Sequence, residues 1–452
     1  DYINWSGIVT RDYNIFETDG KLSDANNWRD GLPGDYEDIY INANAVVEAG
    51  ENLAFGDVTI NDSLTINGSL TAVNVINSDI NKLVMNEGAQ LYQGNNKLYG
   101  QFIMTISNPT DWSESDITKV DGWQFIASPF TNSSISNFTN HSGEYDLYKF
   151  DGTQEDLEWV NHKQGDSGED EEDDGYDNII HGKQGGTESF ETEFVNAYGY
   201  LASYEKVDEN QTKATFSGTF NSAQSHSWNL SYNAEKPLAN FHLLGNPFTF
   251  DMEWNKIAQT NMVDGYAVLN GNGSGYQYMT EGTIKVGDAF FVKTTADDAA
   301  LSYNHYVKTT RNEKANSLNI IATSAEGRDN LIISLSSEKA GFNKLQNFDD
   351  AIATVYVHGE GVNYGIYNCN DDVQEVEVNF NANKMGSYTI SIEPNGKFQT
   401  VTLVDRFTGI ETNMLLEDYH FTAMSSENNN RFIVKMKVNG QQTTDNSHFA
   451  YV

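Results

Sequence analysis

Apolar residues recur at a spacing of nearly six between Val58 and Ile80, with Asn, Asp, Ser or Gly between them. The repeated positions are Val58, Ile60, Leu64, Ile66, Leu70, Val73 and Ile76. Alternation within each short run is typical of β-strands. Polar turn residues at so short a period indicate a parallel β-helix, because each rung buries its inward side chains on the next. We therefore expect a β-solenoid over roughly residues 40–105, with an antiparallel meander as the alternative that the regular spacing disfavours.

The segment before these rungs resembles a cap. Trp5, Asn27-Trp28, Gly31-Leu32-Pro33 and Ile39 combine large apolar side chains with turn residues. An open solenoid end exposes unpaired strand edges. We expect this segment to cover the first rung.

Two later stretches repeat one pattern, WQFIASPFTNSSISNF at 123–138 and FHLLGNPFTFDMEW at 241–254. Each places an aromatic residue six positions before a Pro-Phe-Thr. Pro129 and Pro247 differ by 118 positions, whereas Gly199 and Ala289, in the aromatic strand that follows, differ by 90. The first copy is thus 28 residues longer, and the acidic segment 160–187 accounts for the excess. Duplication of a β unit explains the repeat without an active site, since proline ends a strand and aromatic residues supply core area.

Alternating strands with short turns fill residues 312–440, which indicates a β-sandwich. The predicted fold is all-β: a short β-solenoid, duplicated β-sandwich units, and a C-terminal sandwich of immunoglobulin-like or jelly-roll-like type. The predicted domains are 1–110 for the capped solenoid, 111–310 for the duplication (copies about 111–225 and 226–310), 311–440 for the C-terminal sandwich, and 441–452 for a linker.

A formal net charge of −38 argues against nucleic acid and anionic membrane surfaces as partners. No apolar run approaches membrane-spanning length. The single cysteine, Cys369, allows neither an intrachain disulfide nor a thiolate metal site, and we expect it to be a small buried side chain. The abundance of Asn, Gly, Thr, Ser and Tyr suits a secreted β-protein in its processed form, and the lack of disulfides favours a bacterial exterior.

Several of these motifs resemble the modular surface proteins that Bacteroidetes export by the type IX secretion pathway. The matching segments are Trp5, Asn27-Trp28, Leu64 to Gly68, Ile126 to Pro129, Gly245-Asn246-Pro247, Val404 to Gly409, Tyr419, Phe421, Arg431-Phe432 and His448 to Val452. Ala289 stands where the family pattern has Gly, and the acidic insert departs from it.

The resemblance implies an extracellular or cell-surface location after removal of an N-terminal signal and a C-terminal secretion signal, with the type IX machinery as partner during export. The scaffold serves adhesins, other surface proteins and non-catalytic parts of enzymes, so it implies no catalytic residue. Asp62-Ser63-Leu64 also matches the O-glycosylation pattern of such bacteria, which makes Ser63 a candidate acceptor.

The acidic run GDSGEDEEDDGYDN is a candidate calcium loop, because Ca²⁺ takes six to eight oxygen ligands from Asp-rich loops. The closely spaced candidate ligands are Asp170, Asp173, Asp174 and Asp177. The alternative is a solvated loop, the more usual state of a run of like charges.

Aromatic residues at alternating strand positions suggest a stacking surface for a sugar. The candidates are Tyr145, Tyr148, Trp159, Tyr276 and Tyr278. The same alternation predicts equally well that these side chains fill or pad the core.

The nine histidines include no pair at His-x-x-x-His spacing, and the chain contains no Gly-x-Ser-x-Gly elbow. Gly271 to Gly275 lacks the lysine and the helix of a phosphate loop. We therefore expect a non-catalytic, exported structural or adhesive protein that binds itself or other surface proteins and forms a surface layer or filament. The alternative class is a glycan-binding or polysaccharide-degrading protein.

Overall fold

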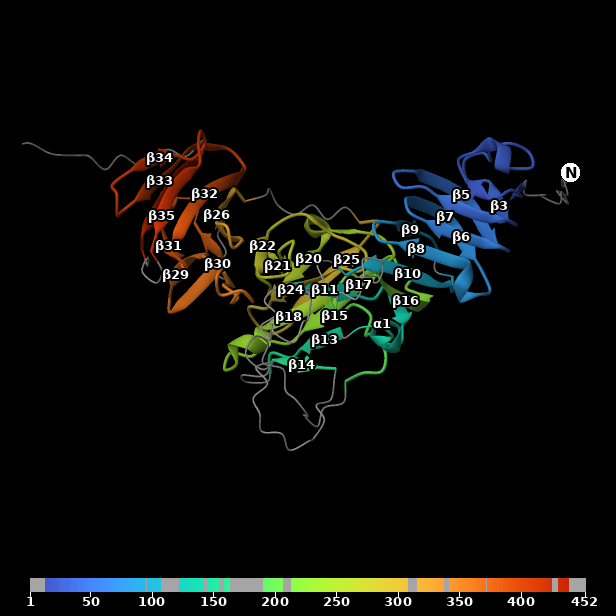
Figure 1. Cartoon of the computed structure of the whole chain (residues 1–452), viewed down its shortest axis with the longest axis horizontal. Coiled ribbons are helices and arrows are strands. Elements are labelled where there is room, and N and C mark those ends of the chain that lie inside the picture. The colour runs from blue at the N-terminus through green and yellow to red at the C-terminus, as the bar shows by residue number, and fades with distance from the viewer. Residues whose placement is uncertain are drawn as a thin grey trace, which may run out of the picture. The chain divides into compact units, whose positions relative to one another are not determined.

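A computed structural model gives the structure of the chain. It describes residues 13–94, 96–106, 122–141, 143, 145–153, 158–162, 190–205, 213–307, 315–336, 341–370, 372–424 and 430–438. These fall into two compact units, one comprising Asp1–Met262 and Glu281–Thr310 and the other Val263–Thr280 and Arg311–Val452. Both consist almost wholly of strands, which confirms the all-β prediction (Figure 1).

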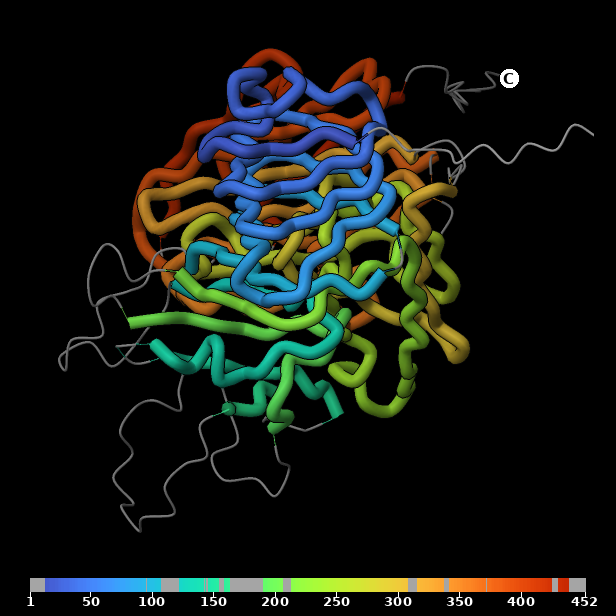
Figure 2. The backbone as a smooth tube through the Cα atoms, turned by 90° about the vertical axis from the view of Figure 1, so that its right-hand side faces the viewer, coloured from blue at the N-terminus to red at the C-terminus, as the bar shows by residue number. Residues whose placement is uncertain are grey.

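The first unit begins with a β-solenoid of two parallel sheets (Figure 2). One sheet contains β1 (Tyr13–Phe16), β3 (Asp38–Ile41), β5 (Asn52–Ile60), β7 (Ser69–Ile76) and β9 (Gln90–Tyr92). The other contains β2 (Gly20–Lys21), β4 (Asn44–Val47), β6 (Ser63–Ile66), β8 (Leu83–Asn86) and β10 (Tyr99–Thr105). The predicted solenoid is confirmed.

One coil of the solenoid takes about 19 residues, because it contributes one strand to each sheet: Ile41 pairs with Ile60, and Ile66 pairs with Met85. The six-residue spacing of the sequence is therefore the step between successive short strands within a coil. Inward side chains such as Leu64 are fully buried. Outward ones form polar ladders, in which Asn86 Nδ2 donates to Asn67 Oδ1 at 2.6 Å.

The first rung carries the predicted cap. Trp28 is buried, its ring lies edge-on to Phe16 at 5.2 Å, and its Nε1 donates to the carbonyl of Leu22 at 2.8 Å. The backbone N–H of Arg29 donates to the carbonyl of Ile15 in the edge strand β1. The chain thus covers its own first edge, as the sequence predicted from Asn27-Trp28; Trp5 lies outside the described residues.

The two Pro-Phe-Thr segments lie at the other end of the solenoid, one on each sheet. Phe130 begins β12 (Phe130–Asn132), which pairs with β16 (Lys213–Phe220), and β16 in turn pairs antiparallel with β10. In the second segment, the Thr249 carbonyl accepts the N–H of Leu91 in β9 at 2.8 Å, and Thr249 Oγ1 donates to the Leu91 carbonyl at 2.6 Å. The second segment thus closes its solenoid sheet directly, whereas the first joins the other sheet through β16.

The two copies are related by a pseudo-two-fold exchange. One sheet has the order β11 (Gln124–Ala127), β15 (Gly199–Tyr204), β13 (Tyr145–Phe150) and β14 (Trp159–Asn161). The counterparts of β11 and β15 are β18 (Phe241–Gly245) and β24 (Ala289–Lys293), which pair antiparallel. Ile126 forms a bridge with Asp288, and Leu244 forms one with Tyr198. The offset of 118 relates Ile126 to Leu244, and the offset of 90 relates Tyr198 to Asp288. Exchange of the two copies therefore converts one bridge into the other.

Counterpart residues also touch one another, as positions close to a two-fold axis do. A Cβ placed on Gly245 would lie 2.4 Å from Cβ of its counterpart Ala127, and one on Gly199 would lie 2.5 Å from Cβ of Ala289. Each contact has room for the one methyl group that the alanine supplies, and a second methyl group on the glycine would overlap with it. Ala289 is accommodated because Gly199 supplies the small partner.

The remaining elements of the first unit are short. They are β17 (Ser225–Leu230), β19 (Met252–Glu253), β20 (Ala258–Thr260), β23 (Thr283–Ile284), β25 (Ala299–Asn304), the helix α1 (Ser136–Thr139), and 3-10 turns at Ala25–Asn27, Ile80–Lys82, Pro237–Asn240 and Trp254–Lys256.

The second unit is the predicted C-terminal sandwich together with the hairpin β21 (Tyr266–Leu269) and β22 (Tyr276–Met279). Its strands form one continuous path, β34-β33-β36-β31-β29-β30-β27-β26-β32-β35, with β28 beside β30. Their bounds are β26 (Ser317–Thr323), β27 (Arg328–Leu335), β28 (Phe342–Asn343), β29 (Thr354–Gly359), β30 (Val362–Cys369), β31 (Glu375–Asn381), β32 (Gly386–Asn395), β33 (Phe398–Asp405), β34 (Glu411–Asn413), β35 (Tyr419–Ala423) and β36 (Phe432–Val438). The path folds over a single apolar core that includes Cys369, which is buried as expected.

Two buried ion pairs lie within this unit. Arg431 donates from Nη2 to Asp405 at 2.7 Å, and Tyr419 donates its hydroxyl to the same carboxylate at 2.7 Å. Lys344 and Asp329 form the second pair at 2.7 Å. The family-like residues Asp405, Tyr419 and Arg431 thus form one buried structural network.

Candidate binding pocket in the C-terminal sandwich

The candidate calcium ligands Asp170, Asp173, Asp174 and Asp177 lie outside the described residues, so the calcium site stays a prediction. Among the residues that the structure describes, no group of three or more His, Cys, Asp or Glu side chains is placed to hold a metal ion.

The candidate sugar-stacking aromatics are mostly enclosed. Tyr148 and Trp159 are each 5% exposed; Tyr148 lies edge-on to Trp123, and Trp159 to Phe291. Tyr145, half-buried, has its hydroxyl 3.1 Å from His162 Nδ1.

In the second unit, Tyr276 is also buried, beside Phe348, and Tyr278 is fully buried beside Phe342. In this structure these rings act as packing residues, which is the alternative that the sequence left open.

Ser63 is the outward residue at the start of β6, as an acceptor for O-glycosylation requires. Its hydroxyl donates to Asn44 Oδ1 at 2.6 Å on the neighbouring coil. Its modification stays a prediction.

The Gly-Asn-Pro segment has a structural role. Asn246 is fully buried; its Nδ2 donates to the carbonyls of Phe250 and Ile284, and its Oδ1 accepts the N–H of Phe248 at 3.0 Å. In the first copy Ser128 Oγ accepts the N–H of Phe130 in the same way. Both side chains stabilise the turn that places the Pro-Phe-Thr segment at the end of the solenoid.

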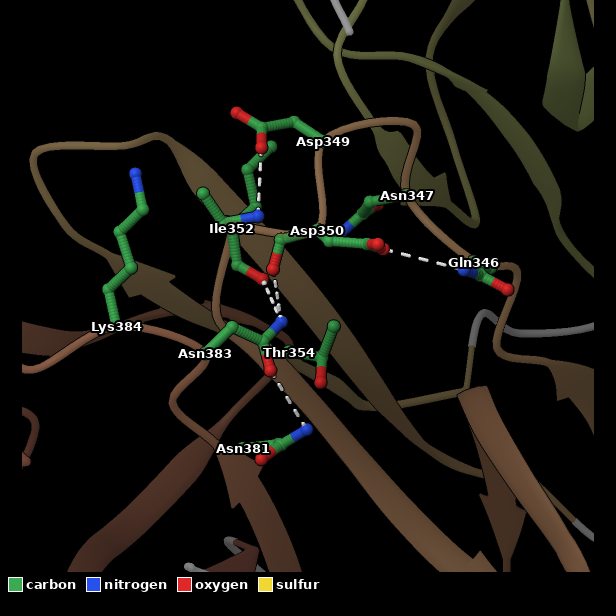
Figure 3. Close-up of a pocket in the computed structure, with 10 residues that line it drawn as sticks. Gln346, Asn347, Asp349, Asp350, Ile352, Thr354, Asn381, Asn383 and Lys384 are labelled. Atoms are coloured by element: carbon green, nitrogen blue, oxygen red, sulfur yellow. Dashed lines mark hydrogen bonds between the residues drawn. The ribbon is translucent and has the colours of Figure 1, made fainter. Parts of the chain in front are cut away.

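A pocket of about 580 Å³, lined mainly by polar residues, opens on the C-terminal sandwich (Figure 3). The loop between β28 and β29 forms one side of it, and the end of β31 with the turn that follows forms the other. The lining residues are Gln346, Asn347, Asp349, Asp350, Ala351, Ile352, Thr354, Asn381, Asn383 and Lys384. We call this the amide pocket, since four of the ten are Asn or Gln.

Hydrogen bonds fix the loop on the first side of the amide pocket. Asp349 Oδ1 accepts the N–H of Ala351 at 2.8 Å, and the Asp349 N–H donates to the carbonyl of Ser274 at 2.9 Å. Asn383 Nδ2 reaches across from the other side to the carbonyls of Asp350 and Ile352. The two sides are thereby tied together with their side chains already in place.

Other polar groups of the amide pocket are only weakly engaged within the described part of the chain. The Asp350 carboxylate has one long contact, 3.4 Å, from Gln346 Nε2. Asn381 donates through Nδ2 to Asn383 Oδ1 at 3.2 Å, which leaves its own Oδ1 as an acceptor. Lys384 forms an exposed ion pair with Glu326 at 3.2 Å. Such groups can exchange water for a polar ligand at little cost.

A second, more charged pocket of about 620 Å³ lies in the first unit, lined in part by Glu87, Lys213, Asp251 and Lys285. Behind it burial raises the pKa of the Asp288 carboxyl to about 7, and the charge of Lys285 opposes this rise. Burial also raises the pKa of Asp251, whose Oδ1 accepts the N–H of Val286 at 3.1 Å. The Asp251 carboxylate thus fixes the backbone at Val286, two residues before Asp288.

No family model matches the chain, and neither a curated protein nor a solved structure is significantly similar to it. Over the described residues, no helix has the length and apolar character needed to cross a membrane.

Sequence reasoning missed the amide pocket. The two sides of the pocket come from short polar runs at strand ends, Asp349-Asp350 and Asn381 to Lys384. Nothing else in the sequence of these runs indicates a binding site. Some 30 positions separate them, and only the pairing of β29 with β31 brings them together.

Proposed function

We propose that the chain is an exported cell-surface protein that acts by adhesion and carries no catalytic activity. The observation that supports this most directly is the amide pocket, in which polar side chains on a rigid loop remain available to a ligand. A scaffold of this kind suits adhesion, because a ligand that meets preorganised groups loses less free energy to ordering.

Assembly into a filament by strand addition at the ends of the solenoid is less well supported than adhesion. The cap at Trp28 covers one end of the solenoid, while β16 and Thr249 occupy the strand edges at the other. Covered edges discourage pairing between chains. Export by the type IX pathway, with that machinery as a transient partner, rests on the sequence motifs and is part of the same proposal.

The test is retention under flow of microspheres coated with the full chain, on cell layers, glycoprotein films and polysaccharide films. Retention above that of albumin-coated spheres, with a sedimentation coefficient independent of concentration, is the expected result. Concentration-dependent polymers without retention would favour a structural, self-assembling protein instead.

The competing class is polysaccharide capture for degradation. Release of new reducing ends from any of the films would contradict the non-catalytic part of the proposal. For export, the chain carrying its own secretion signals should reach the medium of a Bacteroidetes strain with an intact type IX pathway and stay inside a strain that lacks it.

A further inference from the structure

We propose that the amide pocket binds a neutral saccharide through its hydroxyl groups, an inference that rests on the proposed adhesive function and names its ligand class. A sugar hydroxyl both donates and accepts hydrogen bonds, so its complement is a surface that mixes both kinds of group. Asp350 and the Oδ1 of Asn381 supply acceptors, Lys384 supplies donors, and the Thr354 hydroxyl supplies both.

Charge disfavours the ionic alternatives. Asp349 and Asp350 repel an anion, as does the net charge of −38 on the whole chain. A divalent cation would meet the ammonium group of Lys384 and only two carboxylates, one of which already accepts the N–H of Ala351. Ca²⁺ needs six to eight oxygen ligands.

An apolar ligand fits no better. None of the ten described residues that line the pocket is aromatic, and its only aliphatic members are Ala351 and Ile352. Pockets that take apolar ligands are lined mainly by hydrophobic and aromatic groups. The mixed donors and acceptors of the lining therefore favour a neutral, hydroxyl-rich ligand over these classes.

The geometry also suits repeated, weak binding. The opening lies between two turns: Gln346 and Asp350 come from the loop between β28 and β29, and Lys384 comes from the turn after β31 (Figure 3). We expect a Kd on the order of 1 mM for one sugar unit, or about 4 kcal/mol, because none of the ten described lining residues is an aromatic on which a sugar ring could stack. A surface coated with many chains would hold a polysaccharide far more tightly, since linked sites add avidity.

The test is affinity electrophoresis of the full chain through gels that contain mannan, galactan, dextran or xylan, with alginate as the anionic comparison. We expect retardation by at least one neutral polysaccharide and none by alginate. Asp350→Asn and Asn381→Ala should each weaken that retardation about tenfold, which is what the loss of one ligand hydrogen bond predicts. Asp418→Asn, at an exposed carboxylate of the same unit away from the pocket, is the matched control and should change nothing.

Lack of retardation by all four neutral polysaccharides, stronger binding to alginate, or binding that both pocket variants leave intact would each overturn the inference. Circular dichroism of the variants checks that they fold. Adhesion in the flow assay without binding to any polysaccharide would refute the saccharide inference but would still agree with the proposed adhesive function. Failure of both assays would reject both.

Discussion

Replacing Asp288 by Asn is expected to stabilise the first unit at pH 8 and to leave it nearly unchanged at pH 4. Burial raises the pKa of this carboxyl from 3.8 to about 7, with Lys285 opposing the rise and Asp251 and Glu87 adding to it. The folded state therefore holds the proton more tightly than the unfolded state. It follows that the free energy of unfolding falls as the pH rises from about 4 to about 7 and is constant above that.

The size of the effect follows from the two pKa values. A rise from 3.8 to about 7 corresponds to about 4 kcal/mol, at 1.36 kcal/mol for each factor of ten in proton affinity. The side chain keeps some exposure to solvent, so we take about half of this, or about 2 kcal/mol, as the expected difference. Asn keeps the shape of the side chain and an oxygen acceptor for the backbone hydrogen bond from Lys285.

The assay is differential scanning calorimetry of the full chain and of the variant at pH 4.5 and at pH 8. For a unit of this size about 2 kcal/mol raises the Tm of its transition by about 4 °C, so the variant should melt about 4 °C higher at pH 8. Asp297→Asn, at an exposed position of the same unit, is the control for the loss of one negative charge. An equal difference between variant and parent at both pH values would show that Asp288 does not titrate in this range, and would refute the reasoning.

Three further predictions concern packing, a buried charge and the acidic insert. Gly199→Ala should lower the free energy of unfolding by about 1–3 kcal/mol, because its methyl would lie 2.5 Å from Cβ of Ala289 and 2.8 Å from Cγ of Leu243; adding Ala289→Gly should restore the part that is due to the first contact in urea titrations, and no rescue would argue against the contact between the two counterparts. Arg431→Met should cost about 3–5 kcal/mol, since it leaves the Asp405 carboxylate buried without its cation; a loss below 1 kcal/mol in the melting of the second unit would show that the pair is dispensable. Millimolar calcium should slow proteolytic cleavage within 160–187 if Asp170, Asp173, Asp174 and Asp177 bind it, and unchanged cleavage in the presence of calcium would exclude that site.

Local pattern was enough to predict the strands. In the solenoid, alternation at Leu64 and Ile66 identifies the inward face, because every coil repeats the same burial. The length of a coil could not be read in the same way, since the corners between β6 and β7 and between β7 and β8 differ in length and leave no fixed period. In the C-terminal region, strands such as Ser387 to Ile392 and Thr400 to Val404 were predictable for the same reason.

Contacts between distant segments were beyond the sequence. The two Pro-Phe-Thr segments are recognisable as copies, yet nothing in either one says that Phe130 joins one solenoid sheet while Thr249 closes the other. Period-two alternation in β22 places Tyr276 and Tyr278 on one face, but it cannot say whether that face meets solvent or the core. The amide pocket depends on the same kind of information, because its two sides come from separate turns.

We propose that the repeated proline segments are structural elements at the last rung of the solenoid, where Thr249 bonds directly to β9. Hydrogen–deuterium exchange of the Thr249→Val variant, followed by mass spectrometry of peptides that cover β9, tests it most directly. We expect faster exchange in β9, because the variant lacks the hydroxyl that donates to the Leu91 carbonyl. Adhesion of coated microspheres should be unchanged. Unchanged exchange in β9 combined with lost adhesion would show that the segment is itself a functional site.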